Sequence, residues 1–477
     1  NPVELIFTPA GEMIGTMTYF TDPQAGQRDA LLHFVEGGVY PKPHPAIAEF
    51  KRTGDLMPVM TKFARIAPSG LMQYRGKAFG EEFQGDLFTA QFNPHRVQRH
   101  KLFREGATFR TEDSDFVTST DPDFHPTDIL EDADGSLILL ETGGWYVDAC
   151  PLSKIHKGEK RGAIYRIRKT GAPTVDDPRG FNMKLSGLSY ADPWEFQQKA
   201  LEDERPAVRD KAFEVLIANG EKAVPVFMRL REESKLADVR CAAVFALGRI
   251  ATAESAKAIR AALDDADFQV RIAAAHVVGL SKDAEAVARL AAMVKQDEPA
   301  ARRNAATALG QIGDRRAVAA LLEAAANASD RFIEHAITYS LIQLNEAPAL
   351  IAGLKAPQAG TRKAALIALD QLDDSPIVAA HAAPFLGEAD AALRKTALWV
   401  FSRHAEKPEW AGAVLAFLRN RLNADKFDAV ESDSVRDALL AFVADAQVQS
   451  LIAEALNHEQ SSVERQLFLL EVVERCS

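Results

Sequence analysis

Two kinds of hydrophobic periodicity divide the chain. Up to about residue 169, apolar and polar residues alternate over short runs that end at Gly, Pro or Asp, which is typical of strands and turns. From residue 193 onward, apolar residues recur every three or four positions, as in amphipathic helices. Between them, Gly171, Pro173 and Pro178 interrupt regular structure, and we predict a linker over residues 170–192.

The clearest β pattern lies at residues 124–145. Asp134-Gly135 separates two apolar runs, and Gly tolerates the positive φ that a tight hairpin needs. Apolar and basic residues then alternate over 162–168, which predicts another strand. This order of strand, Asp-Gly turn, strand, glycine loop and strand is the pattern of one blade of a β-propeller.

Earlier strands are predicted by the same signals. Residues 7–16 predict a hairpin with a Pro-x-Gly turn. A second blade is predicted from three runs, at residues 67–74, 85–92 and 96–100. Two and a half blades cannot close a ring, and the chain begins at Asn1 within a strand-like run, so we expect a fragment whose upstream blades are missing.

One long stretch of the β region, residues 22–65, is rich in Gly and Pro. We predict a surface insertion there, and long insertions often carry function.

The helical half repeats one pattern. Its copies are marked by nine residues, the first four spaced by 31 positions and the rest by looser steps: Arg209, Arg240, Arg271, Arg302, Glu334, Arg362, Arg394, Arg436 and Glu464. An apolar residue precedes most markers, Ala follows three positions later in six copies, and a large apolar residue follows at +7. At +8, three copies have Gly: Gly248, Gly279 and Gly310.

Positions −1, +3 and +7 share one helical face, so each copy carries an apolar stripe that only stacking can bury. We therefore predict an α-solenoid of about nine repeats over residues 193–477, which resembles the short class of HEAT repeats. The longer step before Arg436 predicts an inserted or extended helix at 407–433, and repeated Arg and Asp residues suggest an ion-pair ladder along the stack. Cys241 is predicted to be a small buried residue of its helix.

Composition narrows the possible functions. The formal net charge of −11 disfavours a nucleic-acid partner, and no apolar run approaches the length of a membrane helix. The three cysteines, Cys150, Cys241 and Cys476, form no Cys-x-x-Cys pair, so there is no motif for covalent haem attachment or a zinc ribbon. No export signal can be read at the start of the sequence.

Four short motifs resemble the closing blades of the soluble glucose/sorbosone dehydrogenase superfamily. They are Ala-Pro-Ser-Gly at 67–70, Gly-Asp-Leu-Phe at 85–88, His-Pro-Thr-Asp at 125–128 and Asp-Gly-Ser-Leu at 134–137. With Gly143-Gly144-Trp145-Tyr146 and the helical repeats, the chain is especially similar to the large membrane-bound dehydrogenase-type proteins of planctomycete-type bacteria. The resemblance implies a six-bladed propeller, a periplasmic or otherwise extracytoplasmic location, pyrroloquinoline quinone and calcium as cofactors, and often a cytochrome c domain further on.

The same resemblance suggests the cofactor-binding residues. In the sugar dehydrogenases, the segment matching His125 and Thr127 carries arginines that hold the quinone carboxylates. The segment matching Pro94 carries a cofactor lysine, and this chain has His95 and Arg96 beside that position. The family's catalytic base belongs to an earlier blade, so no catalytic residue is assigned. His95, Arg96 and His125 are the cofactor-binding candidates.

Other chemical interpretations of the β region remain open at this point. His125 suits a general base or a metal ligand, or else a hydrogen bond to a neighbouring loop. A calcium loop through Asp132, Asp134 and Glu141 would place Leu130 at its first ligand position, which favours an Asp-Gly turn with solvated carboxylates. Asp128 is a fourth acidic residue to which the same two interpretations apply.

Two further groups of residues each have a functional and a structural interpretation. Asp148, Cys150 and His156 match no standard metal-ligand spacing, so no metal site is assigned. Trp145-Tyr146 suits either a pocket mouth or packing between blades.

Two functions follow from this organisation. One is the rear part of a dehydrogenase-like propeller protein that oxidises a sugar or polyol and uses its solenoid to bind a protein partner. The other is a non-catalytic protein-interaction scaffold. Propellers support both, so the sequence leaves enzymatic activity undecided.

Overall fold

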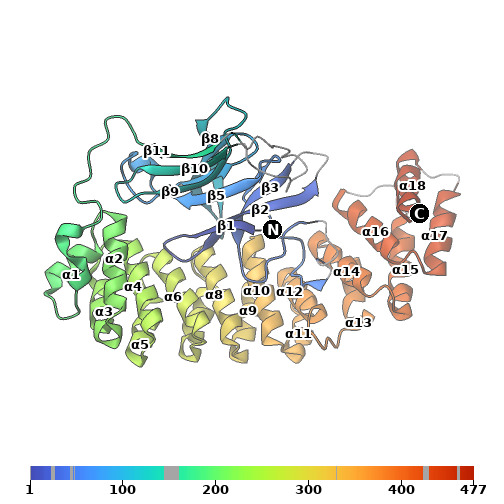
Figure 1. Ribbon diagram of the computed structural model, residues 1–477. Helices are drawn as coiled ribbons and strands as arrows, with labels where there is room; N and C mark the ends of the chain where they lie inside the picture. The colour runs from blue at the N-terminus through green and yellow to red at the C-terminus, as the bar shows by residue number, and fades with distance from the viewer. Residues whose placement is uncertain are drawn as a thin grey trace. The chain divides into compact units, whose positions relative to one another are not determined.

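The computed structural model describes residues 2–22, 27–42, 47, 49–143, 159, 161–328, 330–422, 429–458 and 462–476 (Figure 1). It divides into two compact units. Unit 1 contains Asn1–Phe50 and Leu56–Ile312, and unit 2 contains Lys51–Asp55 and Gly313–Ser477. Unit 1 therefore holds the β-sheets with helices α1 to α8, whereas unit 2 holds α9 to α18 and a five-residue segment from the predicted insertion.

The described strands form three small antiparallel sheets. The first contains β1 (Pro2–Phe7), β2 (Met13–Asp22), β3 (Gln27–Phe34) and β4 (Thr61–Phe63). The second contains β5 (Pro68–Gln73), β6 (Leu87–Gln91), β7 (Arg96–Glu105) and β8 (Thr108–Thr118), and the third contains β9 (Pro126–Glu131), β10 (Leu137–Gly143) and β11 (Arg161–Ile167).

In each sheet the strands neighbour one another in chain order, which is the meander predicted for blade-like units. These described strands do not close into a ring. Two local predictions need correction. The expected insertion at 22–65 contributes β3 and β4 to the first sheet, and β8 was not predicted at all.

The Asp-Gly hairpin is confirmed. Asp132 N donates to Ser136 O at 2.8 Å, and Gly135 has a φ of 75°. Burial acts to raise the pKa of Asp134, but hydrogen bonds from Ser136 and Arg168 outweigh it and lower the pKa to about 2. The carboxylate of Asp134 is therefore committed to the turn and to β11.

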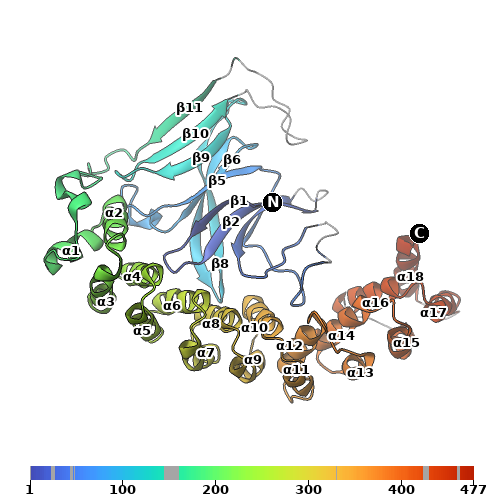
Figure 2. The ribbon, with the colours of Figure 1, turned by 60° about the horizontal axis from the view of Figure 1, so that its bottom comes forward.

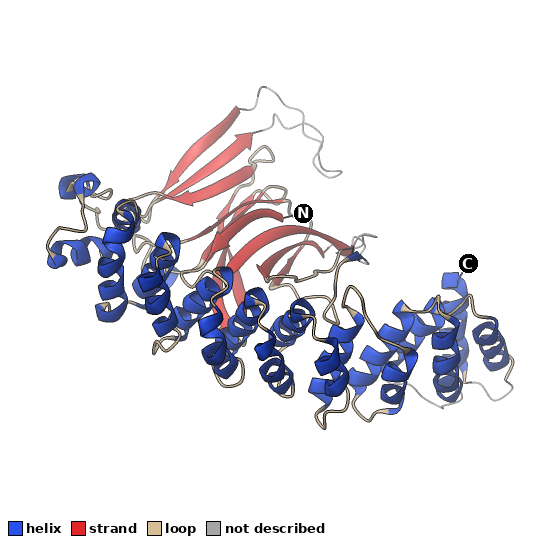
Figure 3. Cartoon of the chain, turned by 90° about the horizontal axis from the view of Figure 1, so that it is seen from below, coloured by secondary structure: helices blue, strands red, loops and turns tan. Residues whose placement is uncertain are grey.

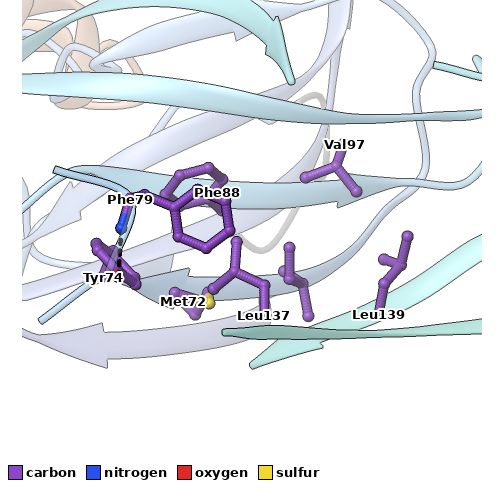
Figure 4. Packing of buried hydrophobic residues seen from close by; sticks show 8 residues of the cluster. Met72, Tyr74, Phe79, Phe88, Val97, Leu137 and Leu139 are labelled. Atoms are coloured by element: carbon purple, nitrogen blue, oxygen red, sulfur yellow. Dashed lines mark hydrogen bonds between the residues drawn. The ribbon is translucent and has the colours of Figure 1, made fainter. Parts of the chain in front are cut away.

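Two hydrophobic clusters join the sheets. One packs β5–β7 against β9 and β10 and is shown in Figure 4. Within it, Phe79 N donates to the Tyr74 hydroxyl at 3.2 Å, and that hydroxyl donates to Gly135 O at 2.9 Å. The other cluster includes Ile14, Leu31, Leu71 and side chains around them, and it packs the first sheet against the second. Each sheet is thus buried against its neighbour along the chain.

Every marked segment of the repeat is an α-helix. These helices are α2 (Pro206–Ile217), α4 (Ala237–Ile250), α6 (Phe268–Leu280), α8 (Pro299–Ile312), α10 (Arg331–Leu344), α12 (Ala359–Asp370), α14 (Ala391–Arg403), α16 (Ala429–Ala441) and α18 (Val463–Cys476). The odd-numbered helices between them are α3 (Val224–Glu233), α5 (Ala253–Ala262), α7 (Val287–Met293), α9 (Val318–Ala325), α11 (Ala347–Gly353), α13 (Ala379–Ala382), α15 (Pro408–Leu422) and α17 (Ala446–Leu456). Within unit 1, Figure 2 shows the even-numbered helices α2, α4, α6 and α8 as one row and the odd-numbered helices α3, α5 and α7 as a second, and Figure 3 shows most of the strands on one side of these helices.

The predicted burial register is confirmed in most copies. The six alanines at +3 are all 0% exposed: Ala212, Ala243, Ala274, Ala305, Ala365 and Ala397. Cys241 is also buried, and burial raises its thiol pKa to about 12. Val463, the residue before the last marker, differs because it is 72% exposed at the start of α18.

The marker arginine has a local role that the sequence did not reveal. In five copies its guanidinium donates to the carbonyl oxygen six residues earlier, in the turn that precedes the helix: Arg209 to Asp203, Arg240 to Ser234, Arg271 to Asp265, Arg362 to Ala356 and Arg394 to Glu388. The proposed ladder also occurs, since Arg240 pairs with Asp265 and Arg271 with Asp297 in the next turn. Arg240 and Arg271 thus close their own turns and contact the next repeat.

The expected linker has short turns of its own. Residues Phe181–Met183 and Leu185–Gly187 form 3-10 turns, and Leu185 is buried near α2. Helix α1 (Trp194–Leu201) begins after Pro193, and Asp192 does not cap it because its carboxylate accepts from Ser189 N.

Candidate functional site

The structure brings two of the three predicted cofactor-binding residues together. His95 lies in the turn before β7, with its ring 5.0 Å from the ring of His125. His95 Nδ1 lies 2.7 Å from Phe124 O, and His125 is only 1% exposed. His125 Nδ1 is within 3.1 Å of two carbonyl oxygens, those of Asp123 and Gly143.

The third predicted residue, Arg96, makes other contacts. Its Nε donates to Gln91 Oε1 at 2.8 Å, and its Nη1 donates to Asp115 Oδ1 at 2.9 Å. Asp115 belongs to the neighbouring strand β8. The charge of Arg96 is therefore balanced within its own sheet.

The environment of His125 favours its neutral form. Burial lowers its pKa most, the nearby His95 lowers it further, and hydrogen bonds to Asp123 and Gly143 act in the opposite direction. A neutral imidazole so enclosed can hold adjacent loops together. None of the three predicted residues lines either of the two hollows described below.

Unit 1 contains a hollow of about 550 Å³ between the β1–β2 turn and helices α2, α4 and α6. Its apolar lining includes Phe7, Phe213 and Phe245. Two of its charged residues neutralise each other, because Arg75 binds both carboxylate oxygens of Asp210 at 2.7 and 2.9 Å. This hollow lies where the β-sheets meet the first repeats.

A second contact between strands and helices in unit 1 is buried and ionic. The Glu12 carboxylate accepts from Arg104 of β7 at 2.8 Å and from Arg303 of α8. Glu12 is 4% exposed, and His33 Nε2 lies 3.8 Å from it. Burial, followed by the charges of the two arginines, holds the pKa of His33 well below its ordinary value.

Unit 2 contains the most specific polar site among the described residues. Its wall consists of α10 (Arg331–Leu344), α12 (Ala359–Asp370) with Gln371 just after it, and α14 (Ala391–Arg403). We call this wall the α10–α14 face. Five residues of unit 2, Lys51–Asp55, contact this face and bend at Gly54 and Asp55, and we call them the inserted segment.

The main chain of the inserted segment is bound at two points. Arg52 N donates to Gln371 Oε1 at 2.7 Å, just beyond the end of α12. Arg331 of α10 donates to Asp55 O. Gly54, between these two points, has a φ of 105°, a conformation that side chains disfavour.

Two side chains of the inserted segment are bound as well. Thr53 Oγ1 lies 2.7 Å from His335 Nδ1 and accepts from Arg331 Nη2 at 2.9 Å. Thr53 is 5% exposed and His335 is 1% exposed, so this contact is fully enclosed. Asp55 forms an ion pair with Lys395 of α14 at 2.8 Å.

Electrostatics at Asp55 favour the bound, ionised form. Burial would raise its pKa, but the hydrogen bond from Lys395 and the charges of Lys395, Arg331 and Lys363 outweigh burial and lower the pKa. At the other end of the segment, the Arg52 guanidinium lies 5.8 Å from the centre of the Trp399 ring. Cation–aromatic contacts at this range are weakly attractive.

A buried network orients Gln371 for its contact with Arg52. The Asp370 carboxylate accepts from Arg403 Nε at 2.8 Å and lies 2.7 Å from His404 Nε2. Gln371 Nε2 donates to the same carboxylate, which turns its carbonyl oxygen toward the inserted segment. Both Asp370 and Gln371 are 5% exposed. The acceptor is therefore set in place by the fold.

The face also has unfilled space beside the inserted segment. A hollow of about 250 Å³ is bordered by Arg52 and Asp55 and by Lys363, Trp399 and Asp437 of the helices. Its walls carry charges of both signs, and Lys363 pairs with Glu334 at 3.0 Å. The hollow leaves space next to Arg52 and Asp55 of the inserted segment.

The sequence predicts the insertion at 22–65 but does not identify the residues of the α10–α14 face. The region 22–65 was predicted to carry function, yet none of Thr53, His335, Asp370 or Gln371 was singled out. One signal was available, because Asp370 stands at position +8, where three earlier copies have Gly. The predicted features at 145, 146, 148, 150 and 156 lie outside the described residues.

Comparison with protein families supports the helical assignment. The family described as "HEAT repeats" matches residues 257–342, and the "PBS lyase HEAT-like repeat" matches residues 239–265. Residues 36–171 match a family described as "Domain of unknown function (DUF7133)". Among curated proteins, no match was found.

Solved structures show distant similarity. Kap121p aligns with 59% of this chain and 37% of its own, at 13% identity and a TM-score of 0.45. Importin beta aligns with 59% of this chain and 46% of its own, at 12% identity and a TM-score of 0.42. A Thermus thermophilus oxidoreductase named as a glucose dehydrogenase aligns with 35% of this chain and 45% of its own, at 19% identity and a TM-score of 0.26. The chain thus spans less than half the length of each.

The family matches and the fold agree on one assignment. The residues of the two repeat-family matches lie on α4 to α10, where the burial register of the repeat is regular. None of the described helices is both long and apolar enough to cross a membrane. The helical half of the chain is solenoid-like, with HEAT-like repeats over residues 239–342.

Proposed function

We propose that this protein is an interaction scaffold whose HEAT-like repeats bind extended segments of polypeptide. The observation that carries the proposal is that the α10–α14 face already binds one such segment, Lys51–Asp55, through both its main chain and its side chains. Repeat arrays provide long surfaces of this kind, and the protein-binding role of many solenoids agrees with it.

The contacts on this face suit recognition rather than catalysis. Arg331 and Lys395 supply fixed positive charge, and the buried side chain of Gln371 supplies an acceptor for a main-chain N–H. A buried acceptor such as Gln371 Oε1 discriminates strongly, because a ligand that does not donate to it loses a hydrogen bond that water cannot replace.

A selection from an unbiased library of 12-residue peptides tests the proposal. The full chain carrying Thr53→Val and Asp55→Asn serves as the target, since these changes loosen the inserted segment. We expect peptides that bind this chain and lose at least tenfold in affinity when Arg331→Ala and Lys395→Ala are added.

The matched control changes one arginine and one lysine elsewhere in unit 2, Arg316→Ala and Lys355→Ala, both on exposed surface. These changes should leave peptide affinity within twofold. Failure to select any peptide, or selection of peptides that ignore Arg331 and Lys395, would contradict the proposed function.

A second candidate is the dehydrogenase-like function that the sequence motifs suggest, with an extracytoplasmic location. The paired rings of His95 and His125 favour it, because a neutral imidazole can accept or donate a hydrogen bond to a cofactor. On this reading the three residues contact pyrroloquinoline quinone, and a sugar or polyol is oxidised with help from residues of other blades.

Calorimetry with the quinone and calcium tests this second candidate on the full chain. Binding should weaken at least tenfold in Arg96→Ala and stay unchanged in Arg110→Ala, an exposed arginine of the same sheet. Absence of binding to the wild type, or equal binding to both variants, removes these residues from a cofactor role.

A further inference from the structure

Polar contacts hold the inserted segment, and they are specific for a hydroxyl group and a carboxylate group. Its Thr hydroxyl is enclosed between Arg331 and His335, and its Asp carboxylate meets Lys395. The residue between them is Gly54, whose φ of 105° lets the chain turn both groups toward the helices. A Thr-Gly-Asp sequence satisfies all three requirements at once.

The position of the acidic group is also specific. Three cations, Arg331, Lys363 and Lys395, act on Asp55 from three successive repeats. An amide in place of this carboxylate would keep the shape but lose the charge–charge attraction. A partner segment therefore needs an acidic residue two positions after its Thr.

The outer contacts of the segment are weak enough to be exchanged. The Asp55 side chain is 67% exposed and that of Lys395 is 42% exposed. Lys51 pairs with Asp373, which is 82% exposed. Exposed ion pairs of this kind add little stability. The enclosed contacts at Thr53 and at Gln371 are therefore the main ones to be broken on release.

We propose that the α10–α14 face is a binding site for partner segments that carry Thr-Gly-Asp, and that Lys51–Asp55 occupies this site as an internal competitor. This inference rests on the proposed scaffold function and names its ligand and its regulation. Because the competitor belongs to the same chain, its effective concentration is high, and a free peptide has to exceed it. The hollow of about 250 Å³ leaves room for flanking side chains of a partner.

A labelled peptide with the sequence of residues 49–57, Glu-Phe-Lys-Arg-Thr-Gly-Asp-Leu-Met, tests the inference by fluorescence anisotropy. The two proteins are the wild-type chain and a full chain in which residues 52–55 are replaced by Gly-Ser-Gly-Ser. We expect the replaced chain to bind the peptide at least tenfold more tightly than the wild type. Melting curves of both proteins show whether the replacement leaves unit 2 folded.

Two matched controls identify the site. A peptide with Asn in place of its Asp should bind the replaced chain about two- to fivefold more weakly, because the pair with Lys395 is exposed, and a peptide with Val in place of its Thr should lose at least tenfold. If the replaced chain does not fold, the double variant Thr53→Val and Asp55→Asn takes its place in the same measurement.

The outcomes separate this inference from the proposed function. No binding to a folded competitor-free chain, or equal binding to this chain and to the wild type, overturns the inference. Library peptides that depend on Arg331 and Lys395, together with no binding of the 49–57 peptide, would leave the scaffold function in place and remove the internal competitor.

Discussion

Thr53 Oγ1 lies 2.7 Å from His335 Nδ1, although 282 positions separate the two residues in the sequence. Arg331 Nη2 donates to the same oxygen at 2.9 Å, so the Thr53 hydroxyl joins two side chains of α10. The contact is the enclosed centre of the α10–α14 face, and both residues are almost fully buried there.

Replacing Thr53 with Val should destabilise unit 2. The methyl group keeps the shape but leaves His335 and Arg331 without this oxygen, and we expect a loss of about 1–3 kcal/mol in the free energy of unfolding. Urea denaturation followed by tryptophan fluorescence measures it. Thr396→Val is the control, because the Thr396 hydroxyl donates to Ala392 O within its own helix, and its effect should stay below about 0.5 kcal/mol. Equal effects would show that the Thr53 contact adds nothing.

Two Gly→Ala substitutions in unit 2 should act in opposite directions. Gly54→Ala forces a side chain into a φ of 105° and should cost about 1–3 kcal/mol. Gly412 lies within α15 with open space where a Cβ would be added, so Gly412→Ala should stabilise by about 0.5–1 kcal/mol. Thermal and urea melts of the two variants give the comparison, and a neutral Gly54→Ala would mean that the inserted segment relaxes freely.

The buried +3 position of the repeat gives a sharper test of register. Ala274→Asp places a charge at a fully buried helix contact and should cost about 2–4 kcal/mol. Ala253→Asp, at the exposed first residue of α5, should change stability by less than about 0.5 kcal/mol. Similar values at both positions, measured by chemical denaturation, would mean that the assigned stripe does not face the core.

Replacing a marker arginine should lower the free energy of unfolding more than replacing a surface arginine. Arg240→Met removes the donation to Ser234 O and the pair with Asp265, whose side chain is 9% exposed, and we expect a loss of about 1.5–3 kcal/mol. Arg229→Met removes an exposed pair with Glu233 one turn away in α3 and should cost less than about 0.5 kcal/mol. Denaturation of both variants decides whether the marker has a structural role.

His33 should make the stability of unit 1 depend on pH. Its folded-state pKa is depressed, so the unfolded chain binds more protons as the pH falls below about 6.5, and stability is lost in that direction. One group contributes at most about 1.4 kcal/mol per pH unit. In urea melts from pH 7.5 to 5.0, His33→Gln should flatten the pH profile relative to the wild type. The exposed His458→Gln should follow the wild-type profile, and an unchanged slope in His33→Gln would contradict this assignment.

The repeat could be predicted from sequence because its signals are local and recur. Val208, Ala212 and Leu216 each lie within one helical turn or two of their marker, and the same spacing returns in later copies. The Asp-Gly hairpin was equally accessible, since Gly135 and the flanking apolar runs specify the turn within a few residues. Local chemistry of this kind needs no knowledge of distant contacts.

The site on unit 2 could not be predicted in the same way. Thr53 and Asp55 are ordinary loop residues until two helices far along the chain supply Arg331, His335 and Lys395. The predicted cofactor residues illustrate the converse case. Arg96 is well placed by motif, but the neighbouring strand supplies Asp115, and motif matching does not report such a partner.

In five copies, the bond from the marker arginine to the carbonyl six residues earlier begins and ends within a single repeat. Duplication or deletion of a whole copy during evolution therefore leaves this bond intact in the copies that remain, whereas an ion pair to the next repeat, such as Arg240–Asp265, would have to form again with a new neighbour. Changes of chain length are then tolerated best in steps of whole repeats. The α10–α14 face spans three successive copies and is more vulnerable, because loss of the first or last copy removes Arg331 or Lys395, and loss of the middle copy removes Lys363 and Gln371.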